Sequence, residues 1–356
     1  MGKGVLKGVC GTGIETPEKR TDSLKEQFEI MKIIFMGTPD FAVGALEALL
    51  KAGHEVTAVV TQPDKQKGRD RKVQFSPVKE CALAHGLTVF QPARIKTREA
   101  VETLKKFEAD IFVVAAFGQI LSKEILEMPR YGCINIHASL LPKYRGASPI
   151  QYAILNGDDV TGVTIMQMNE GMDTGDILTM KAIPVEKDDT GGSLFEKLSA
   201  LGAELLIKTL PKIEAGEIIP VKQQEEDATH VRMLTKNMGR IDWKKDADVL
   251  ERLVRGMNPW PSAYCSFRGK SLKVWRAEIS REEQKEEIVR TGLFRHSEEK
   301  ETIPGEVLLV KKDSIYVQTG RDVLVLKEVQ FEGKKRMPVQ DFLLGCQVKA
   351  GEFFES

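Results

Sequence analysis

The sequence predicts an α/β protein, in which a domain with a mostly parallel sheet is followed by a smaller domain of short strands. Its length of 356 residues is enough for two domains that each bury a core. From Met31 to Gly216 apolar runs alternate with segments of helical periodicity, which is typical of a parallel α/β sheet. After residue 240 the chain changes to short alternating runs separated by glycine-bearing turns, which predict a small barrel or sandwich.

The first half of the α/β domain can be followed element by element. KIIFMG predicts the first strand, and DFAVGALEALLKAG has helical apolar spacing with a glycine at its end. HEVTAVVTQ predicts a second strand, and SPVKECALAHG a helix with Ser76 as N-cap and Pro77 in its first turn. LTVFQP and DIFVVAAFG follow as strands, separated by a helix that Thr97 can cap. CINIHA is the fifth strand. The apolar runs of these strands are continuous rather than alternating, which indicates strands covered on both faces.

The remaining elements define the expected domain boundaries. TGVTIMQM, DILTMKAIPV and the long helix SLFEKLSALGAELLIKTLPKIEAG complete the first domain. The polar stretch that follows has no clear period and is expected to be a linker. Beyond it DADVLERLVRGM predicts a helix, and AYCSFRG, SLKVWRAEI, GEVLLVKKD, SIYVQTG and VLVLKEVQF predict strands. The expected boundaries are 31–220 for the first domain, 221–240 for the linker and 241–349 for the second domain.

Composition excludes several classes of protein. Equal numbers of basic and acidic residues give no net charge, so attraction to nucleic acid or membrane must come from local patches. No apolar run reaches the roughly 18 residues of a membrane span, and we expect a cytoplasmic protein. The cysteines are scattered, without a CxxC motif or Cys/His ligand spacing, so we expect reduced thiols and no structural zinc. They are Cys10, Cys81, Cys133, Cys265 and Cys346.

Two segments do not fit either domain. Residues 1–30 lack the apolar stretch of a signal peptide and contain acidic residues, which transit peptides avoid. We expect a disordered extension or one that is not native, such as a misassigned start, with an ordered appendage as the alternative. Residues 281–302 are highly charged and are expected to form a solvated excursion between strands.

Polar residues at the end of the fifth strand are the first candidate site. Asn135 and His137 point to the same face of that strand, at the edge where α/β sheets bind ligands. Asp173, in GMDTGDI, is the third candidate. A neutral imidazole accepts a proton near physiological pH, a carboxylate assists it, and a fixed amide stabilises a developing oxyanion. The set suits transfer of a carbonyl carbon by direct attack of an amine.

Structural explanations remain open for the same residues. A strand histidine is commonly a core residue with a satisfied hydrogen bond, and an aspartate in a glycine-rich turn is commonly a cap. No serine or cysteine nucleophile lies beside the three in sequence, which disfavours a covalent intermediate. The turn MGTPDF lacks a GxGxxG fingerprint, so a nicotinamide cofactor is not expected.

Two basic stretches are candidate contacts for a polyanion. QPDKQKGRDRKVQ, residues 62–74, follows the second strand and leaves the same sheet edge as His137. A second basic stretch, GKKRM, lies in the far domain. Solvated surface is the alternative for both, although two separate patches on a neutral protein fit a long phosphate backbone. The candidate residues are Lys65, Lys67, Arg69, Arg71, Lys72, Lys334, Lys335 and Arg336.

A long motif resembles a known superfamily. NIHASLLPKYRGASPIQYAILNGDDVTGVTIMQMNEGMDTGDIL is similar to the folate-dependent formyltransferases. IIFMGTPDFA, VVTQPDKQKGR, SPVK, RIDW, NPWPSAY and GKKRM, in this order, narrow the resemblance to the methionyl-tRNA formyltransferase family. The resemblance covers about residues 31–348. Tyr144 stands where a tryptophan is common, and the N-terminal extension has no counterpart.

The resemblance implies a fold, a reaction and a set of residues. The fold is a Rossmann-like formyltransferase domain followed by a smaller OB-like β-barrel that assists tRNA binding. The reaction moves the formyl group of 10-formyltetrahydrofolate to the α-amine of methionine on initiator Met-tRNA, for translation initiation, with no metal and by a monomer. The family's catalytic Asn, His and Asp correspond to Asn135, His137 and Asp173, and its basic loop to residues 62–74, with Arg69 at the key position. Its folate-binding stretch corresponds to Ser139, Leu140, Leu141 and Pro142.

Other functions share part of this pattern. Relatives that formylate a small amine, such as glycinamide ribonucleotide or an amino-sugar nucleotide, have the same three catalytic residues. The basic loop and the second domain favour tRNA, because a small-molecule enzyme needs neither. A non-catalytic RNA-binding protein on this fold would be expected to lose one of the three, and all three are present. Which of His137 and Asp173 is the primary base stays open.

Overall fold

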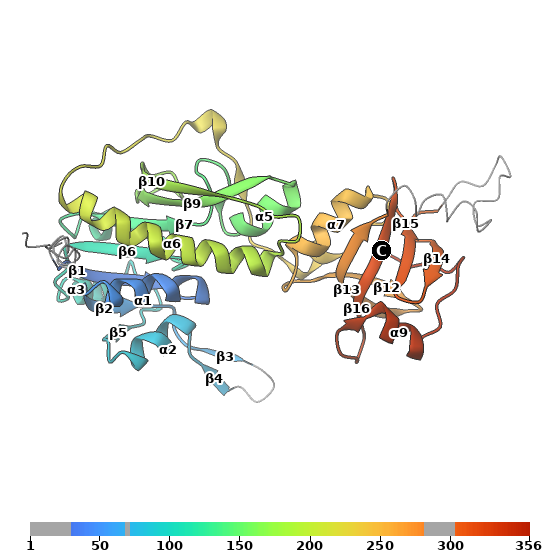
Figure 1. Ribbon diagram of the computed structural model, residues 1–356. Coiled ribbons are helices and arrows are strands. Elements are labelled where there is room, and N and C mark those ends of the chain that lie inside the picture. Colours follow the sequence, from blue (N-terminus) through green and yellow to red (C-terminus); the bar gives the residue numbers. More distant parts are fainter. Residues whose placement is uncertain (1–29, 68–71, 281–302) are drawn as a thin grey trace, which may run out of the picture.

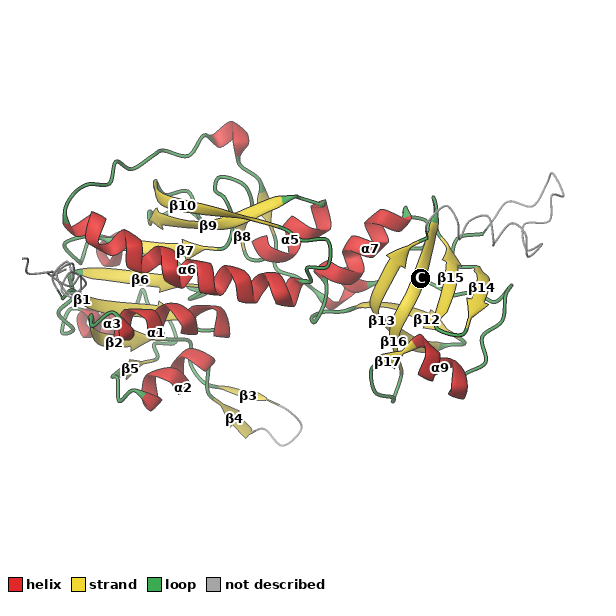
Figure 2. Ribbon diagram, in the orientation of Figure 1, coloured by secondary structure: helices red, strands yellow, loops and turns green. Residues whose placement is uncertain are grey.

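The computed structural model describes residues 30–67, 72–280 and 303–356, which form two lobes (Figures 1 and 2). The expectations for the N-terminal extension and for residues 281–302 concern segments outside the described residues. Each lobe is built around its own sheet, and the helices α5 (Pro149–Asn156) and α7 (Ala247–Gly256) meet where the lobes join. Within the described residues, none of the helices has the length and apolar character needed to cross a membrane.

The sheet of the N-terminal lobe has seven strands in the order β10-β9-β7-β6-β1-β2-β5. The strands β1, β2, β5, β6 and β7 are mutually parallel. At one edge β9 runs antiparallel to β7, and β10 runs antiparallel to β9. The predicted α/β fold with a mostly parallel sheet is therefore confirmed. The strands are β1 (Lys32–Gly37), β2 (Glu55–Val60), β5 (Val89–Phe90), β6 (Ile111–Ala115), β7 (Cys133–His137), β9 (Val160–Gln167) and β10 (Ile177–Pro184).

Helices cover both faces of this sheet (Figure 2). One face packs against α1, α2, α5 and the long α6, and the other against α3 and α4. The predicted caps are confirmed, because Ser76 accepts from the Lys79 amide and Thr97 from the Ala100 amide. The helices are η1 (Asp40–Ala42), α1 (Val43–Lys51), α2 (Pro77–Ala84), α3 (Arg98–Leu104), α4 (Lys123–Leu126), α5 (Pro149–Asn156) and α6 (Gly191–Glu214).

Smaller elements lie around the ends of the strands. The antiparallel strands β3 and β4 belong to the basic segment after β2, and a short parallel pair joins β8 to β11. The segment between α6 and α7 contains β11 and two short 3-10 helices. These elements are β3 (Lys65–Lys67), β4 (Lys72–Gln74), β8 (Arg145–Gly146), η2 (Glu225–Asp227), β11 (His230–Val231) and η3 (Lys236–Gly239).

The C-terminal lobe is an antiparallel sheet in the order β12-β13-β16-β15-β14, with β17 added to β16. The C-terminal tail pairs with both edges of this sheet: Glu355 with Ser266 in β12, and Phe353 with Glu306, the residue before β14. These pairings bring the sheet toward closure as a barrel. The elements are α7 (Ala247–Gly256), β12 (Ala263–Phe267), β13 (Lys270–Ile279), β14 (Val307–Lys311), β15 (Ser314–Gln318), β16 (Val323–Phe331), β17 (Met337–Pro338) and α9 (Val339–Gly345).

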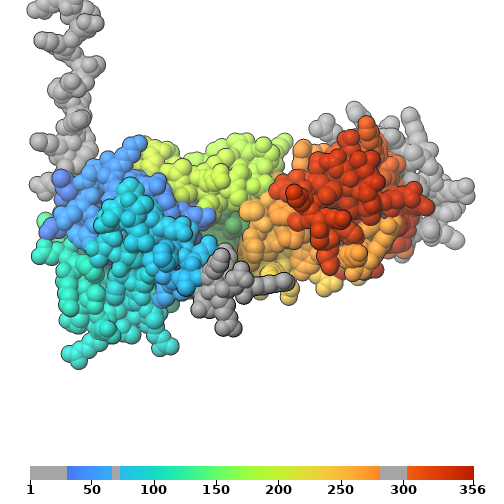
Figure 3. All heavy atoms as spheres, turned by 90° about the horizontal axis from the view of Figure 1, so that it is seen from below, coloured from blue at the N-terminus to red at the C-terminus, as the bar shows by residue number. Residues whose placement is uncertain are grey.

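The lobes touch through closely packed backbone. The Gly192 amide donates to the Asn258 carbonyl at 2.9 Å, and an Arg255 guanidinium donates to the Asp189 carbonyl at 2.8 Å. A Cβ added at Gly191 would lie 2.6 Å from the Gly256 carbonyl oxygen, so only glycine allows this approach. The space-filling view shows the two lobes in contact side by side (Figure 3).

Candidate active site

The candidate site begins at the carboxyl end of β7. Ile134 and Ile136 belong to the core beneath α6, and Cys133 belongs to the core on the opposite face. Asn135 and His137 therefore lie on the Cys133 face, as the alternation predicts. Asn135 is 8% and His137 5% exposed, so two polar side chains occupy a nearly dry position at the ligand-binding edge.

A backbone carbonyl fixes the tautomer of His137. Its Nε2 lies 3.0 Å from the carbonyl oxygen of Tyr144, and a carbonyl oxygen only accepts, so Nε2 has the proton. In the neutral ring Nδ1 is then the atom with a free lone pair. Nδ1 lies 3.7 Å from Oδ2 of Asp173, too far for a direct hydrogen bond. The histidine thus keeps a proton acceptor facing the carboxylate.

Asp173 is held by a turn of the neighbouring loop between β9 and β10. Its Oδ2 accepts from the Gly146 amide at 2.8 Å, and its backbone has a φ of +55°, in the left-handed region that aspartate tolerates better than most residues. Gly146 has a φ of +114°, and a Cβ there would lie 2.2 Å from the Val231 carbonyl oxygen. Glycine is therefore required at the position that orients the carboxylate.

The Asn135 side chain makes no hydrogen bond to any described residue. Its amide atoms are not among the fully buried, unpartnered side-chain atoms of the described residues, so the amide is open to a ligand or water at this edge of the sheet. The strand β7 fixes the amide beside the imidazole. The arrangement provides an unused amide NH₂ group and a proton acceptor on one face of β7, with the Asp173 carboxylate facing the imidazole, a combination that can stabilise an oxyanion and accept a proton.

The stretch expected to contact folate forms the loop after β7. The Ser139 hydroxyl donates to the Lys143 carbonyl at 2.6 Å, and the Leu141 amide donates to Oγ1 of Thr164 at 3.1 Å. Leu140 is half-buried and Leu141 is buried. The loop is therefore rigidly placed next to His137. Pro142 follows in the same loop and is half-buried.

Thr164 is a site residue that sequence reasoning missed. It pairs with His137 across β7 and β9, is fully buried, and its hydroxyl donates to the Ser139 carbonyl at 2.7 Å. One hydroxyl thus satisfies two backbone groups of the loop that follows His137. The signal was a threonine at a core position of an apolar strand, but its partner cannot be read without the register of β9.

Tyr144 closes this loop. Its hydroxyl donates to Asp158 at 2.7 Å and accepts from the Asn156 amide at 2.9 Å. Burial, together with the Asp158 carboxylate, raises the pKa of Tyr144 to about 12. The phenol therefore stays protonated and anchors the loop that presents its carbonyl to His137.

The basic segment 62–74 leaves the same edge of the sheet, because β2 and β7 are parallel and both end there. Lys65 is exposed on β3. Hydrogen bonds from Gln91 and Lys79 lower the pKa of Asp64, so this acid is ionised and paired with Lys79. Arg69 and Arg71, and the side chains of Lys67 and Lys72, lie outside the described structure.

The second basic stretch is only partly free. Lys334 and Lys335 are exposed. Arg336 donates twice to the Glu328 carboxylate, at 2.8 and 2.6 Å, and its guanidinium lies 4.8 Å from the centre of the Trp275 ring. Two of the three predicted cations are therefore available to a ligand without breaking a bidentate pair.

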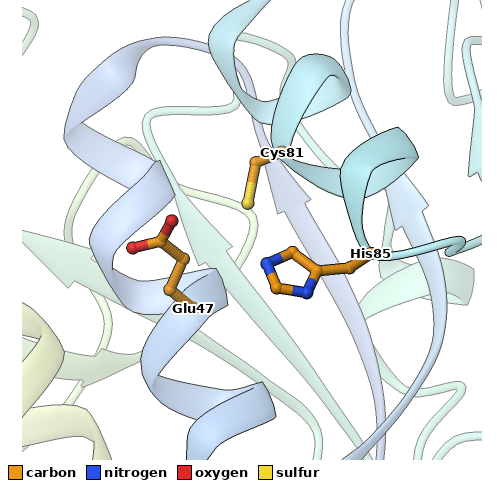
Figure 4. Close-up of side chains that lie close together, drawn as sticks. All are labelled: Glu47, Cys81 and His85. Carbon is orange, nitrogen blue, oxygen red and sulfur yellow. The ribbon is translucent and has the colours of Figure 1, made fainter.

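A second group of chemically active side chains lies on α1 and α2 (Figure 4). Cys81 lies in α2, His85 is the residue that caps its C-terminal end, and Glu47 faces them from α1, with the donor atoms of all three within 4.8 Å. This donor set is one that zinc accepts. No Cys/His ligand spacing was recognised in the sequence, so this cluster was not predicted. A Cys and a His four residues apart on a predicted helix were the available signal.

Comparison with known families covers nearly all of both lobes. Residues 31–210 match the formyl transferase model, and residues 233–347 match the model of the formyl transferase C-terminal domain. The methionyl-tRNA formyltransferase of Agathobacter rectalis is 55% identical over 324 residues, which are 91% of this chain and 99% of that one. The protein of the same name from Lachnospira eligens is 52% identical over 324 residues, 90% of this chain and 98% of that one.

Solved structures share the fold at low identity. An N-formyltransferase from Helicobacter canadensis, in complex with folinic acid and dTDP-3-aminofucose, has a TM-score of 0.59 and 20% identity, covering 87% of this chain and all of that one. HypX from Aquifex aeolicus in complex with tetrahydrofolic acid has a TM-score of 0.58 and 17% identity, covering 92% of this chain and 51% of that one.

Proposed function

We propose that both lobes serve one reaction at the end of β7, and the premise is that this chain belongs to the formyl transferase family. The protein transfers a formyl group from a folate donor to the α-amine of methionine on Met-tRNA. The acceptor follows from relatives named methionyl-tRNA formyltransferase, which are 52–55% identical over about nine-tenths of this chain. The free donor is 10-formyltetrahydrofolate and the preferred acceptor is the initiator Met-tRNA.

Asn135 is the oxyanion donor in this proposal. Attack of an amine on the formyl carbon moves negative charge onto the formyl oxygen, and a fixed N–H donor stabilises that charge more than it stabilises the starting carbonyl. The Asn135 amide has no described protein partner to compete for it. This unpartnered amide beside His137 is the observation that supports the proposal most directly.

His137 and Asp173 manage the protons. The carbonyl of Tyr144 holds the proton on Nε2, so Nδ1 of His137 is the atom that accepts the proton of the attacking amine. Asp173 lies 3.7 Å away and stabilises the resulting imidazolium. When the tetrahedral intermediate collapses, the bond from the formyl carbon to N10 breaks, and N10 takes the proton back from the imidazolium as tetrahydrofolate leaves. This assigns His137 as the acceptor and Asp173 as the stabilising carboxylate, in a chemistry that uses protein side chains and no metal.

The folate donor is expected against the loop after β7. That loop places half-buried Leu140 and Pro142 next to His137, and it is fixed by Thr164 from the neighbouring strand. Apolar walls with a few fixed polar groups are typical of small-molecule sites. The donor supplies the formyl carbon, and the chain supplies the oxyanion donor and the proton acceptor.

The tRNA is expected along the basic segment 62–74 and the C-terminal lobe. Lys65 is exposed near the site edge, and Lys334 and Lys335 are exposed in the far lobe. Cations on both lobes suit a polyanion longer than a nucleotide. A monomer acting in the cytoplasm is the simplest setting for this reaction.

The deciding experiment measures formyl transfer from 10-formyltetrahydrofolate to Met-charged initiator tRNA, with Met-charged elongator tRNA and glycinamide ribonucleotide in parallel. Transfer to the initiator alone is the expected result. Transfer to the small amine alone would retain the chemistry of Asn135 and His137 but remove the role of the basic segments. No transfer to any acceptor would contradict the proposal.

A further inference from the structure

The segment that joins the lobes contacts the candidate active site directly. Residues 221–231, called the connector below, leave the neighbourhood of α6 and arch over the β10 edge of the sheet before reaching α7 (Figure 1). Val221 exchanges both backbone hydrogen bonds with Ile177, at 2.8 and 2.9 Å. The connector therefore adds to the sheet at the edge strand that follows the Asp173 loop.

The far end of the connector pairs with the loop that follows His137. His230 and Val231 form the parallel pair with Arg145 and Gly146. The hydroxyl of Thr229 accepts from the Tyr144 amide at 2.8 Å. The Arg145 amide, which belongs to the same peptide as the Tyr144 carbonyl, donates to the Thr229 carbonyl at 2.8 Å. The peptide whose carbonyl holds the proton of His137 is thus fixed from the connector side.

Gln223 connects these two ends. Its Nε2 donates to the carbonyls of Asp173 and Gly175, at 2.8 and 2.7 Å, and its Oε1 accepts from Nε of Arg145 at 3.0 Å. The orientation of the amide is unambiguous, because its nitrogen faces two acceptors and its oxygen faces a guanidinium that only donates. Three of the four hydrogen-bonding positions of one side chain are used on the residues around the site.

Arg145 explains why Gln223 is held so firmly. Its side chain is 1% exposed, and its guanidinium also donates to Glu225 at 2.8 Å. A buried guanidinium must be paired, since leaving it unpaired costs several kcal/mol, about 3–5 when one partner of a buried pair is removed. Both of these side-chain partners come from the connector.

We propose that Gln223 is a positioning residue for formyl transfer, which holds the Asp173 turn so that its carboxylate faces Nδ1 of His137. This rests on the function proposed above. The Asp173 backbone is in the left-handed region, so its turn needs outside support, and the two Gln223 bonds supply it. Because the same connector continues into α7, the C-terminal lobe and the geometry of the catalytic pair are joined by covalent chain and by hydrogen bonds.

The test compares two variants that distinguish the role of the Gln223 oxygen, which accepts from Arg145, from that of its nitrogen, which donates to the Asp173 turn. Gln223→Glu keeps an acceptor for Arg145 but loses both N–H donors to the Asp173 turn, and Gln223→Ala loses everything. Gln224→Ala, an exposed neighbour without a described side-chain bond, is the matched control. We expect both Gln223 variants to lower kcat about tenfold or more, because small displacements of a catalytic group are costly. KM for Met-tRNA and for folate is expected to change by less than about twofold.

The same variants are then made in an Asp173→Asn background. If Gln223 acts through Asp173, its substitution lowers kcat there by much less than in the parent protein. A Gln223→Glu variant with the kcat of the parent would overturn the proposal, as would an undiminished loss in the Asp173→Asn background. A wrong acceptor would be seen in the parent protein itself, assayed with Met-tRNA and with glycinamide ribonucleotide. A wrong role for Gln223 would be seen only in the ratio of variant to parent.

Discussion

At the scale of single residues, the site depends on one backbone carbonyl. The Tyr144 carbonyl places the His137 proton on Nε2 and leaves Nδ1 facing Asp173. Tyr144 has a left-handed backbone, with a φ of +62°, and its phenol is anchored to Asp158. In the proposed mechanism, main-chain geometry therefore sets the direction of proton transfer, which side-chain substitution at His137 alone does not reveal.

Asn135→Ala tests the oxyanion role. We expect kcat to fall about 10²–10³-fold, the typical cost of removing one oxyanion donor, with little change in KM for folate. The melting temperature should be preserved, because the amide makes no described hydrogen bond. The measurement is steady-state formyl transfer beside thermal unfolding, with exposed Asn237→Ala as the control. A variant that loses stability in proportion to its activity would indicate a structural role for Asn135 instead.

Residues of the site differ in how far the sequence predicts them. The alternation of β7 is enough to place Asn135 and His137 on one face, because a strand has a period of two residues. Thr164 and Gln223 could not be found in this way. Their roles depend on the register of β9 and on the path of a polar segment without periodicity, and neither is encoded in local pattern.

At the scale of elements, the start of α6 is stabilised by a buried acid. Asp189 has a side chain that is 3% exposed, accepts from Ser193 at 2.7 Å and pairs with Lys197 at 2.8 Å. Burial raises the pKa of Asp189, but the Lys197 and Ser193 bonds outweigh it and hold the pKa below its ordinary value of 3.8. A carboxyl whose folded pKa is lowered adds stability above its unfolded pKa and loses it as the pH falls through the folded value.

Asp189→Asn should therefore destabilise the protein in a pH-dependent way. At pH 7 we expect a loss of about 1–3 kcal/mol in the free energy of unfolding, as for hydrogen bonds to a charged group. The difference from the parent should shrink as the pH falls below about 4, where the unfolded aspartate is protonated. Urea unfolding at several pH values measures it, with exposed Asp188→Asn as the control. A difference that is constant with pH would show that the charge is not involved.

The basic segment around β3 and β4 is the element expected to contact the acceptor. Arg69→Ala combined with Arg71→Ala should raise KM for Met-tRNA and leave KM for folate unchanged, because only the tRNA has a phosphate backbone. The slope of log KM for Met-tRNA against log salt concentration should become shallower, by the equivalent of about one to two released counterions. Lys212→Ala, an exposed lysine at the end of α6, is the control. Equal salt dependence in variant and parent would remove this segment from the tRNA interface.

Prediction of whole elements succeeded where pattern and capping agree. The predicted strands of both sheets and the helices that begin after Ser76 and Thr97 are present, since these signals are local. The helices α4, α5 and α9 were not predicted, and the basic segment expected to be a loop contains the strands β3 and β4. The connector was expected to be a linker because it has no period. In the structure its backbone pairs with Ile177 and Arg145, and such non-local pairing leaves no trace in a polar sequence.

At the scale of the whole molecule, the lobes are held by backbone packing at Gly191. Gly191→Ala would place a Cβ 2.6 Å from the Gly256 carbonyl oxygen and 3.0 Å from that of Asn258, and backbone atoms cannot move aside cheaply. We expect a loss of about 1–3 kcal/mol in stability, as for overpacking, with a raised KM for Met-tRNA. Calorimetry and tRNA kinetics measure this, and Gly345→Ala, where a Cβ meets open space, is the control. An unchanged melting temperature would mean that the close backbone contact at Gly191 does not contribute to stability.

The backbone pairing between the connector and the loop after His137 has a consequence for recombination between relatives. A chimera that exchanges the C-terminal lobe before residue 221 would replace Gln223 and Glu225, the two side-chain partners of Arg145. It would also replace strand β11, whose Val231 carbonyl lies against Gly146. The modular boundary of this protein therefore lies after Val231: the lobes are exchangeable parts only if the connector travels with the catalytic one.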